Sequence, residues 1–493
     1  MLKIIRNKQF LVPIILSLVF VFLSSLCLSL SIWHDEAYSA YLIRGDFADI
    51  WNLTALDVHP PLYYFCLKIW SLLFGVSEIG LRSMSIFWGV VAIFGAFYLV
   101  KKLFDFKTAS IATGFMVLAP MFVRYAEEAR MYTMVLAIVI LSMLVLMKAV
   151  EVTWATKKSK WTSWWLLYGL LLAIGMWTHY FIALAFVTQL AYLVLRYRRQ
   201  MIRPDIITGY VMAIVLFLPW LPECFKQVMS VEGGFWIPEV SGMTIINFLV
   251  ESFIFIPDAS WITNWGAVAL FCGAVAIIGL IIYVITKRYI MVKNSGGLLL
   301  AMMVVVPPIL LLLLSLPPLK PMFVSRYLVY SATILWLFLG VLVAKINSKK
   351  IAGIFGGLLF VVAILGLNAV FTRWANSDIK ALLTDINVKY NDENSVIVAG
   401  TERIYLDTIF YSNDKMMVYG VEDFYSSTNG AFAPMKEYKY QIVPDFEDVP
   451  KSDNLWIILD SGEKNIPGGW TEVIRIDTDE HAAIKISPVG SDF

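Results

Sequence analysis

The sequence is short of charge. Asp, Glu, Lys and Arg make up 15% of its residues, whereas a soluble globular domain contains about 25%. The hydrophobic share is 59% and the mean hydropathy is +0.73, so much of the surface must face something other than water. The net charge of +2 excludes the strongly basic balance that is typical of nucleic-acid-binding proteins.

Cysteine and nucleotide-binding motifs are equally scarce. The four cysteines are scattered without metal-ligand spacing, which favours a role as apolar filling. There is no Walker loop, no GxGxxG between a strand and a helix, no HExxH and no CxxC, which argues against a nucleotide-driven machine. No spacing demands a cofactor. A divalent metal ion stays open only because residues of ligand type are present.

Long apolar runs dominate the first 371 residues. Eleven of them are long enough, or nearly so, for a membrane span, which needs about 20 residues, and none contains Asp, Glu, Lys or Arg. They are Phe10–Ser31, Ser83–Val100, Thr108–Val123, Met131–Met147, Ser163–Thr178, Phe181–Leu195, Ile206–Leu221, Asn264–Thr286, Gly296–Leu316, Tyr327–Ala344 and Ile351–Phe371. No small-residue cleavage site follows the first run, so we expect it to be an uncleaved span rather than a signal peptide.

A further apolar run, Leu62–Phe74, has only 13 residues and is interrupted by Lys68, which suits an interfacial segment better than a span. If it does not cross, six clusters with nineteen Lys and Arg residues all fall on one face, which the positive-inside rule makes cytoplasmic. We therefore predict an outer-surface helix held by Tyr63, Tyr64 and Trp70. The protein is then a multi-pass protein of the cytoplasmic membrane, with its N-terminus inside and its C-terminus outside.

The composition changes abruptly at Thr372. Short β-rich runs separated by turn signals follow, with a helical pattern over Arg403–Tyr411. The predicted strands are Ser395–Ala399, Met416–Tyr419, Leu455–Leu459, Glu472–Ile476 and Ala482–Ile486. We predict a transmembrane domain over residues 1–371 and a small extracytoplasmic α/β domain over residues 372–493.

Ionisable residues gather in the predicted outer loops. The motif Trp33-His34-Asp35-Glu36-Ala37-Tyr38 directly follows the first span. Asp35 there is either a general base for an acceptor hydroxyl or amine or the N-cap of a helix. His59 opens the predicted surface helix in His59-Pro60-Pro61-Leu62-Tyr63-Tyr64, where it either binds a phosphate or metal or has a structural role.

A second charged motif, Arg124-Tyr125-Ala126-Glu127-Glu128-Ala129-Arg130-Met131-Tyr132, lies between the third and fourth spans. In a helix, Glu127 would pair with Arg130 and Arg124 with Glu128. The functional interpretation is a second carboxylate with an arginine for an anionic substrate. The alternative is an ion-pair cluster within a helix.

Two further outer positions carry polar groups at headgroup depth. His179 lies at the tip of a tight hairpin, Trp177-Thr178-His179-Tyr180, where it contacts a lipid phosphate or belongs to an interfacial belt. Arg326, followed by Tyr327, precedes the tenth span, where an arginine suits bidentate phosphate binding or serves as a snorkelling anchor.

These motifs together resemble the GT-C fold glycosyltransferases. The resemblance is nearest to the branch that contains the dolichyl-phosphate-mannose-protein mannosyltransferases and the lipid A aminoarabinose transferases. It covers about residues 1–370 and rests on four motifs in order, Trp33-His34-Asp35-Glu36-Ala37-Tyr38, His59-Pro60-Pro61-Leu62-Tyr63-Tyr64, Glu127-Glu128-Ala129-Arg130-Met131-Tyr132 and Thr178-His179-Tyr180.

The resemblance implies an α-helical polytopic membrane glycosyltransferase, hexosyl- or mannosyltransferase-like. Its donor would be a polyprenyl-phosphate sugar and its acceptor a lipid, glycan or protein on the outer face, with no nucleic acid involved. Asp35 maps to the essential acidic residue of the first outer loop, and Glu128, with Glu127 beside it, to that of the second. The predicted catalytic residues are Asp35 and Glu128, and the predicted substrate-binding residues are Glu36, His59, Glu127, Arg130, His179, Arg326 and Tyr327.

Two other function classes compete with the enzyme. A transporter or lipid flippase usually carries ionisable residues within its spans, and the spans here carry no Asp, Glu, Lys or Arg. A non-catalytic membrane subunit would leave the Glu127–Arg130 cluster without a purpose.

Overall fold

The computed structural model describes residues 8–155, 163–198, 203–230, 237–254, 273, 295–372, 378–390, 395–412, 416–424, 441–463 and 466–489. The chain forms two compact units that do not follow its order. The first unit comprises Met1–Leu28, Arg82–Lys226 and Ile237–Arg373, and the second comprises Ser29–Leu81, Gln227–Trp236 and Trp374–Phe493. The segment after the first span thus belongs to the same compact unit as the C-terminal part of the chain.

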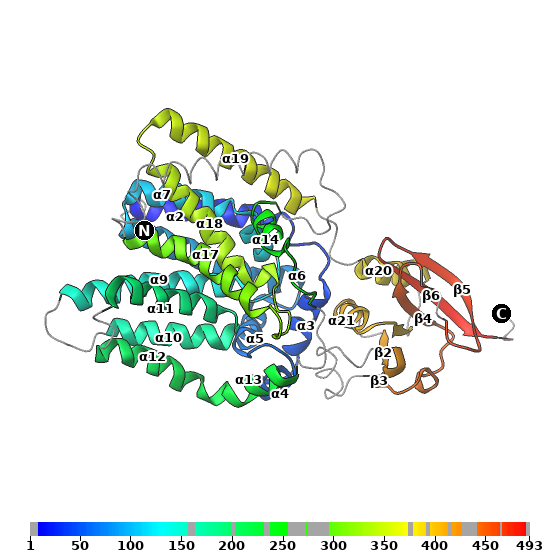
Figure 1. Cartoon of the computed structure of the whole chain (residues 1–493). Helices are drawn as coiled ribbons and strands as arrows, with labels where there is room; N and C mark the ends of the chain where they lie inside the picture. Colours follow the sequence, from blue (N-terminus) through cyan, green and yellow to red (C-terminus); the bar gives the residue numbers. More distant parts are fainter. Residues whose placement is uncertain are drawn as a thin grey trace. The chain divides into compact units, whose positions relative to one another are not determined.

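The first unit is a bundle of apolar helices, among which α9 to α12 lie side by side (Figure 1). Its main helices are α2 (Lys8–Ser25), α6 (Glu78–Leu103), α7 (Phe106–Val117), α8 (Pro120–Ala126), α9 (Tyr132–Ala155), α10 (Ser163–Thr178), α11 (Ile182–Tyr197), α12 (Pro204–Phe217), α13 (Leu221–Ser230), α14 (Thr244–Phe253), α17 (Ser295–Leu314), α18 (Val329–Ala344) and α19 (Lys349–Phe371). Two 3₁₀ turns, η2 (Leu218–Trp220) and η5 (Ser325–Leu328), precede α13 and α18.

Ten of the eleven predicted spans fall on helices of this bundle, and the run Asn264–Thr286 lies, apart from Gly273, outside the described residues. Six of the described helices are long and apolar enough to cross a membrane on their own. The predicted polytopic helical fold is therefore confirmed. The first helix ends at Ser25, short of the predicted Ser31, and the Ser25 hydroxyl donates to the carbonyl of Phe22 at 2.7 Å, a local bond that competes with helix continuation.

One predicted span is broken. The run Thr108–Val123 is divided between α7 and α8, which meet at an angle of 61°. The break lies directly before Pro120, because a proline disfavours the helical conformation at the residue that precedes it. The short helix α8 therefore changes direction before it delivers the charged motif that follows.

Apolar side chains cover the outside of the bundle. Large hydrophobic residues such as Leu18, Leu195 and Ile214 are each more than 60% exposed. A soluble protein rarely exposes such contiguous apolar surface, whereas spans with hydrocarbon on their outer face require it. The protein is a membrane protein with its apolar helices in the bilayer.

The second unit begins with three helices, α3 (His34–Leu42), α4 (Phe47–Leu56) and α5 (Leu62–Phe74). The helix α5 has the predicted bounds and ends at Gly75, whose φ of 79° suits the achiral residue. Lys68, which interrupts its apolar run, donates to the carbonyls of Ile43 and Gly45 at 3.0 and 2.5 Å. Leu72 and Leu73 are about three-quarters exposed, as a helix at the membrane surface would require.

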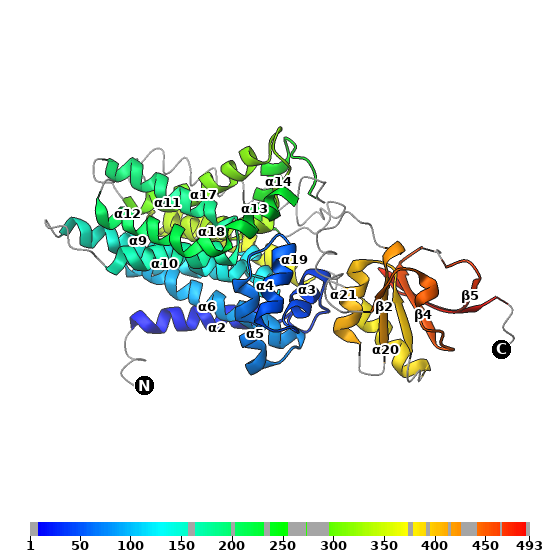
Figure 2. The same cartoon turned by 90° about the horizontal axis from the view of Figure 1, so that it is seen from below.

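The C-terminal part of this unit is a six-stranded sheet flanked by helices (Figure 2). The strands are β1 (Val396–Ala399), β2 (Met417–Val421), β3 (Ile442–Val443), β4 (Leu455–Asp460), β5 (Trp470–Asp477) and β6 (His481–Pro488), in the order β3-β2-β1-β4-β6-β5. The first four are parallel where they pair, and β6 runs antiparallel to β4 and β5. The helices α20 (Ile379–Tyr390) and α21 (Glu402–Tyr411) pack against each other and the sheet. The expected α/β fold of this part is confirmed, and the short β3 was not predicted.

Candidate active site

The candidate residues form two groups, one in each unit. In the second unit, α3 begins at His34 with Trp33 as its N-cap. Asp35 therefore lies in the first helical turn, and the interpretation of Asp35 as the N-cap is wrong, because the extended backbone that a cap needs falls on Trp33. A carboxylate in the first turn is favoured by the positive end of the helix dipole. The Asp35 side chain is 21% exposed, and its Oδ1 lies 3.5 Å from Nε2 of His34.

Glu36 has different surroundings from Asp35. It is fully buried, and its Oε2 accepts the backbone N–H of Trp33 at 3.5 Å. This is the reciprocal half of a capping box, in which the third helical residue reaches back to the cap. The local chemistry of the turn therefore gives Glu36 a role in starting the helix and leaves Asp35 as the more accessible carboxylate.

The helix α3 is held by a hydrogen-bonded chain from the C-terminal part of the same unit. The backbone N–H of Ile32 donates to the Tyr411 hydroxyl at 2.6 Å, and that hydroxyl donates to Glu78 Oε1 at 3.2 Å. Lys380 donates to the same oxygen at 2.7 Å. In addition to these hydrogen bonds, α21 packs directly on α3, and the Arg44 guanidinium donates to a carbonyl of α21 at 3.1 Å. The role of Tyr411 could not be predicted from the sequence, because its partners lie more than 300 residues away along the chain.

His59 forms a dyad with Asp57. The distance between His59 Nδ1 and Asp57 Oδ2 is 3.0 Å, and both side chains are mostly buried. Because an ionised carboxylate only accepts, the pairing favours the proton on Nδ1 and leaves Nε2 to act as an acceptor. Asp57 was not predicted as a site residue, although its position two residues before His59 could have indicated that the two side chains pair.

In the first unit, the charged motif between α8 and α9 is buried. Arg124, Glu127, Glu128 and Arg130 are each at most 6% exposed. Arg124 Nη2 lies 2.5 Å from Glu128 Oε1, as the predicted spacing requires. The residues after Ala126 form turns rather than a continuous helix, so the alternative of an ion-pair cluster within a helix does not describe them. Burial of four charged groups is costly unless they are paired or serve a function.

The turn itself is fixed by a hydroxyl from α6. The Ser85 hydroxyl donates to the carbonyl of Glu128 at 2.5 Å and lies 3.3 Å from the carbonyl of Arg130. Ser85 was not predicted, because nothing in the sequence around it marks it among the other residues of an apolar span. Its contacts hold the backbone that orients the two charged side chains.

Aromatic rings connect this turn to the other candidates of the unit. The Tyr132 ring lies 4.9 Å from that of Tyr125 and 6.2 Å from the imidazole of His179. The His179 ring in turn lies 5.2 Å from Tyr327. Arg326 directly precedes Tyr327 in η5. The structure therefore brings together residues from the α8–α9 turn, the α10–α11 turn and η5.

The resulting cluster combines cationic and carboxylate groups at the ends of apolar helices. We call Arg124, Glu127, Glu128, Arg130, His179 and Arg326 the buried polar cluster; Arg326 is the one member that is only partly buried. Guanidinium groups suit bidentate binding of phosphate. The arrangement can bind an anionic group beside hydrocarbon.

Comparisons with known proteins agree with this picture. Residues 58–222 match the profile of the dolichyl-phosphate-mannose-protein mannosyltransferase family, a region that contains His59, Glu128 and His179. The structure is similar to that of ArnT from Cupriavidus metallidurans bound to undecaprenyl phosphate, with a TM-score of 0.62 and 11% sequence identity over 96% of this chain and 97% of that one. The chain has the GT-C fold.

Oligosaccharyltransferases share the fold. The structure is similar to the apo form of the Archaeoglobus fulgidus enzyme, with a TM-score of 0.52 and 11% identity over 92% of this chain and 70% of that chain. It is also similar to AglB from the same organism in complex with an inhibitory peptide and a dolichol-phosphate, with a TM-score of 0.51 and 11% identity, covering 92% and 69%. No curated protein matches the sequence. The resemblance recognised from the four motifs is confirmed at the level of the fold.

Proposed function

We propose that the protein transfers a sugar, a mannosyl or other hexosyl group, from a polyprenyl-phosphate donor to an acceptor on the outer face of the cytoplasmic membrane. The observation that carries the proposal is the fold, shared along nearly the whole chain with a glycosyltransferase bound to undecaprenyl phosphate. The buried polar cluster gives this fold a place for an anionic headgroup, and the apolar bundle suits the lipid tail. The acceptor class is a lipid, a glycan or a protein.

The donor phosphate would bind to the basic members of the cluster. Arg326, Arg130 and His179 are the proposed phosphate ligands, and Tyr327 stacks against Phe181 at 4.6 Å beside them. Negative charge accumulates on the phosphate as the glycosidic C–O bond breaks and the oxygen takes the electron pair. Fixed cationic donors in a site of low dielectric stabilise such charge strongly.

The acceptor would be activated by the first group of residues. Asp35 takes the proton from the acceptor hydroxyl or amine while that atom attacks the anomeric carbon from the side opposite the leaving phosphate, which inverts the configuration. His59, oriented by Asp57, and Glu36 are proposed substrate-binding residues. Glu128 is the proposed second acidic catalytic residue, with Glu127 as a neighbouring substrate ligand. The pairing of Glu128 with Arg124 supports an ionised carboxylate there.

The membrane topology completes the proposal. The clustered Lys and Arg residues support a cytoplasmic position for the N-terminus and for one set of loops. The first inter-span segment and the α/β domain then lie on the outer face, where the acceptor is found. The exposed apolar face of α5 supports its predicted position on the outer membrane surface.

A proteoliposome assay with a radiolabelled polyprenyl-phosphate sugar tests the proposal against the flippase alternative. The protein is reconstituted with the donor and with candidate acceptors prepared from cell envelopes. The proposal predicts label in an acceptor product, together with unlabelled polyprenyl phosphate. Movement of the intact labelled lipid to the opposite leaflet, without any product, would establish the flippase instead.

A further inference from the structure

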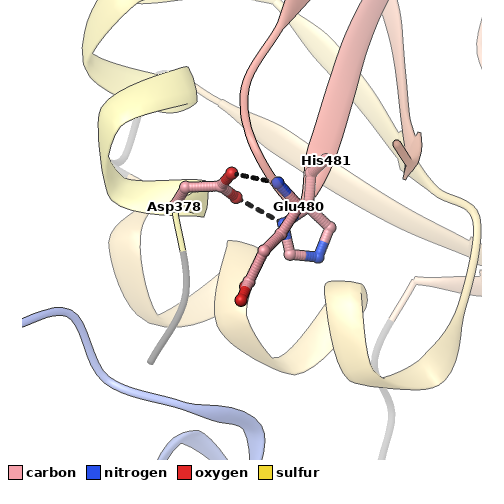
Figure 3. A group of neighbouring side chains, drawn as sticks. All are labelled: Asp378, Glu480 and His481. Carbon is pink, nitrogen blue, oxygen red and sulfur yellow. Dashed lines mark hydrogen bonds and ion pairs between the residues drawn. The ribbon is translucent and has the colours of Figure 1, made fainter. Parts of the chain in front are cut away.

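Three ligand-type side chains, Asp378, Glu480 and His481, meet at one end of two neighbouring strands of the C-terminal sheet, and Asp460 lies beside His481. Asp460 ends β4 and His481 begins β6, and the two residues are directly opposite each other in the antiparallel pairing. Glu480 belongs to the turn before His481, and Asp378 directly precedes α20 (Figure 3). Nitrogen or oxygen atoms of Asp378, Glu480 and His481 all lie within 4.8 Å of one another. Three elements of the fold therefore position one set of groups.

Asp378 determines which nitrogen of the His481 ring carries hydrogen. Its carboxylate accepts a short hydrogen bond from His481 Nδ1 and the backbone N–H of Glu480 at 2.9 Å, the two dashed lines of Figure 3. The Asp378 carboxylate thus accepts from two N–H groups. An ionised carboxylate only accepts. Nδ1 is thus the donor, and in a neutral ring the lone pair is on Nε2.

That lone pair points to a second acceptor. His481 Nε2 lies 3.8 Å from Asp460 Oδ1, and two groups with lone pairs face each other there without a donor between them. A proton or a metal ion on Nε2 resolves this arrangement. The side chain of Asp460 is 56% exposed and that of His481 is 12% exposed, so the position is open to solvent on the Asp460 side.

Negative charge accumulates around this position. Among the residues that the structure describes, Asp378 and Asp460 form ion pairs with His481 and with no lysine or arginine. Three carboxylates around one imidazole leave an uncompensated negative charge that a divalent cation would balance.

We propose that this part of the sheet binds a divalent transition-metal ion of the zinc class. His481 Nε2 and the carboxylates of Asp460 and Glu480 are the ligands, and water completes the coordination. Asp378 is a positioning residue that holds the ring through Nδ1, the pattern in which a carboxylate orients a metal-bound histidine. The site is separate from the residues proposed for sugar transfer.

The donor set decides the class of metal. One imidazole nitrogen with two carboxylate oxygens suits Zn²⁺, which binds such atoms at about 2.0–2.2 Å in tetrahedral sites. Ligand atoms around a tetrahedral ion at these lengths are about 3.3 Å apart, so the exposed Asp460 carboxylate needs only a small rotation from its 3.8 Å separation. Ca²⁺ prefers six to eight oxygens, more than these residues offer.

Equilibrium dialysis of the full-length, tag-free protein against ⁶⁵Zn²⁺ tests the proposal. The chain contains four histidines, so the measurement compares variants rather than relying on stoichiometry alone. We expect Asp460→Asn and Glu480→Gln each to weaken one zinc site at least tenfold. The exposed residues Asp453 and Glu463 supply matched controls, because Asp453→Asn and Glu463→Gln make the same chemical changes nearby.

A second readout keeps the test independent of folding. Co²⁺ in place of Zn²⁺ gives visible absorption that reports nitrogen and oxygen ligation, and we expect Asp460→Asn to change this spectrum while the controls do not. Zinc affinity that is equal in the wild type, Asp460→Asn and Glu480→Gln would overturn the proposal. Absence of zinc binding in the wild type would overturn it too, and would indicate a protonated His481 between the carboxylates.

Discussion

The link between Tyr411 and the segment that carries Asp35 makes a prediction that can be worked out from the structure. The Tyr411 hydroxyl accepts the backbone N–H of Ile32 at 2.6 Å and donates to Glu78 at 3.2 Å. Ile32 is fully buried and lies three residues before Asp35. The substitution Tyr411→Phe removes only the hydroxyl oxygen, so it deletes both bonds and keeps the ring.

The expected magnitude follows from the buried N–H. Glu78 keeps its bond from Lys380, so the main loss is the acceptor of the Ile32 amide. A buried donor without an acceptor costs about 1–3 kcal/mol, which corresponds to roughly a 5- to 150-fold change in an equilibrium constant. We expect local opening of the segment around residues 29–42 to increase by this factor.

Hydrogen–deuterium exchange with mass spectrometry of the full-length protein in detergent measures this opening, because amide exchange reports local unfolding. Peptides covering residues 29–42 should exchange faster in Tyr411→Phe, while peptides of α9 and α18 should not change. Tyr98→Phe is the matched control, since the Tyr98 hydroxyl has no hydrogen-bond partner within the described part of the chain. Unchanged exchange in residues 29–42, or an equal increase along the whole chain, would refute the reasoning.

Three further predictions follow from the other contacts. Loss of Glu128 alone should destabilise the protein by about 3–5 kcal/mol, because it leaves the buried Arg124 without this partner. A double-mutant cycle with Arg124→Met, measured by denaturation in detergent, should show coupling between the two residues. Additive effects on the free energy of unfolding would contradict the pairing. Lys68→Met should raise amide exchange at the C-terminal end of α3, since the ammonium donates to two carbonyls there; unchanged exchange would contradict it. Asp57→Asn and His59→Gln should lower the rate of sugar transfer to the same extent. The double variant should transfer sugar as fast as either single variant, as expected of residues that act as one unit. Additive losses of rate would argue against a dyad.

Much of the fold could be predicted from local pattern. Apolar runs without charge predict where the membrane helices lie, although several helix ends differ from the ends of the runs. The helix α5 has the predicted bounds because Pro61 and Gly75 cap its two ends. The bend before Pro120 was also encoded locally, but the continuous apolar composition across it hid the break. An apolar run therefore predicts that a segment lies in the membrane more clearly than it predicts where the helix axis bends.

The candidate site divides in the same way. The spacing of Arg124 and Glu128 indicated their contact, because both partners lie within two turns of chain. The contacts of Tyr411 with Ile32 and Glu78 join residues 379 and 333 positions apart, and no local pattern encodes them. For the same reason, the grouping of the first inter-span segment with the C-terminal sheet in one compact unit could not be read from the sequence.

The most direct test of the proposed function is a single-turnover transfer assay with the Asp35→Asn variant in proteoliposomes. The substitution keeps the size of the side chain and removes its basicity. We predict that the variant binds the polyprenyl-phosphate sugar as the wild type does and forms no product, while Asp453→Asn, an exposed control, transfers normally. Product formation by Asp35→Asn at the rate of the wild type would contradict the assignment of Asp35 as the base.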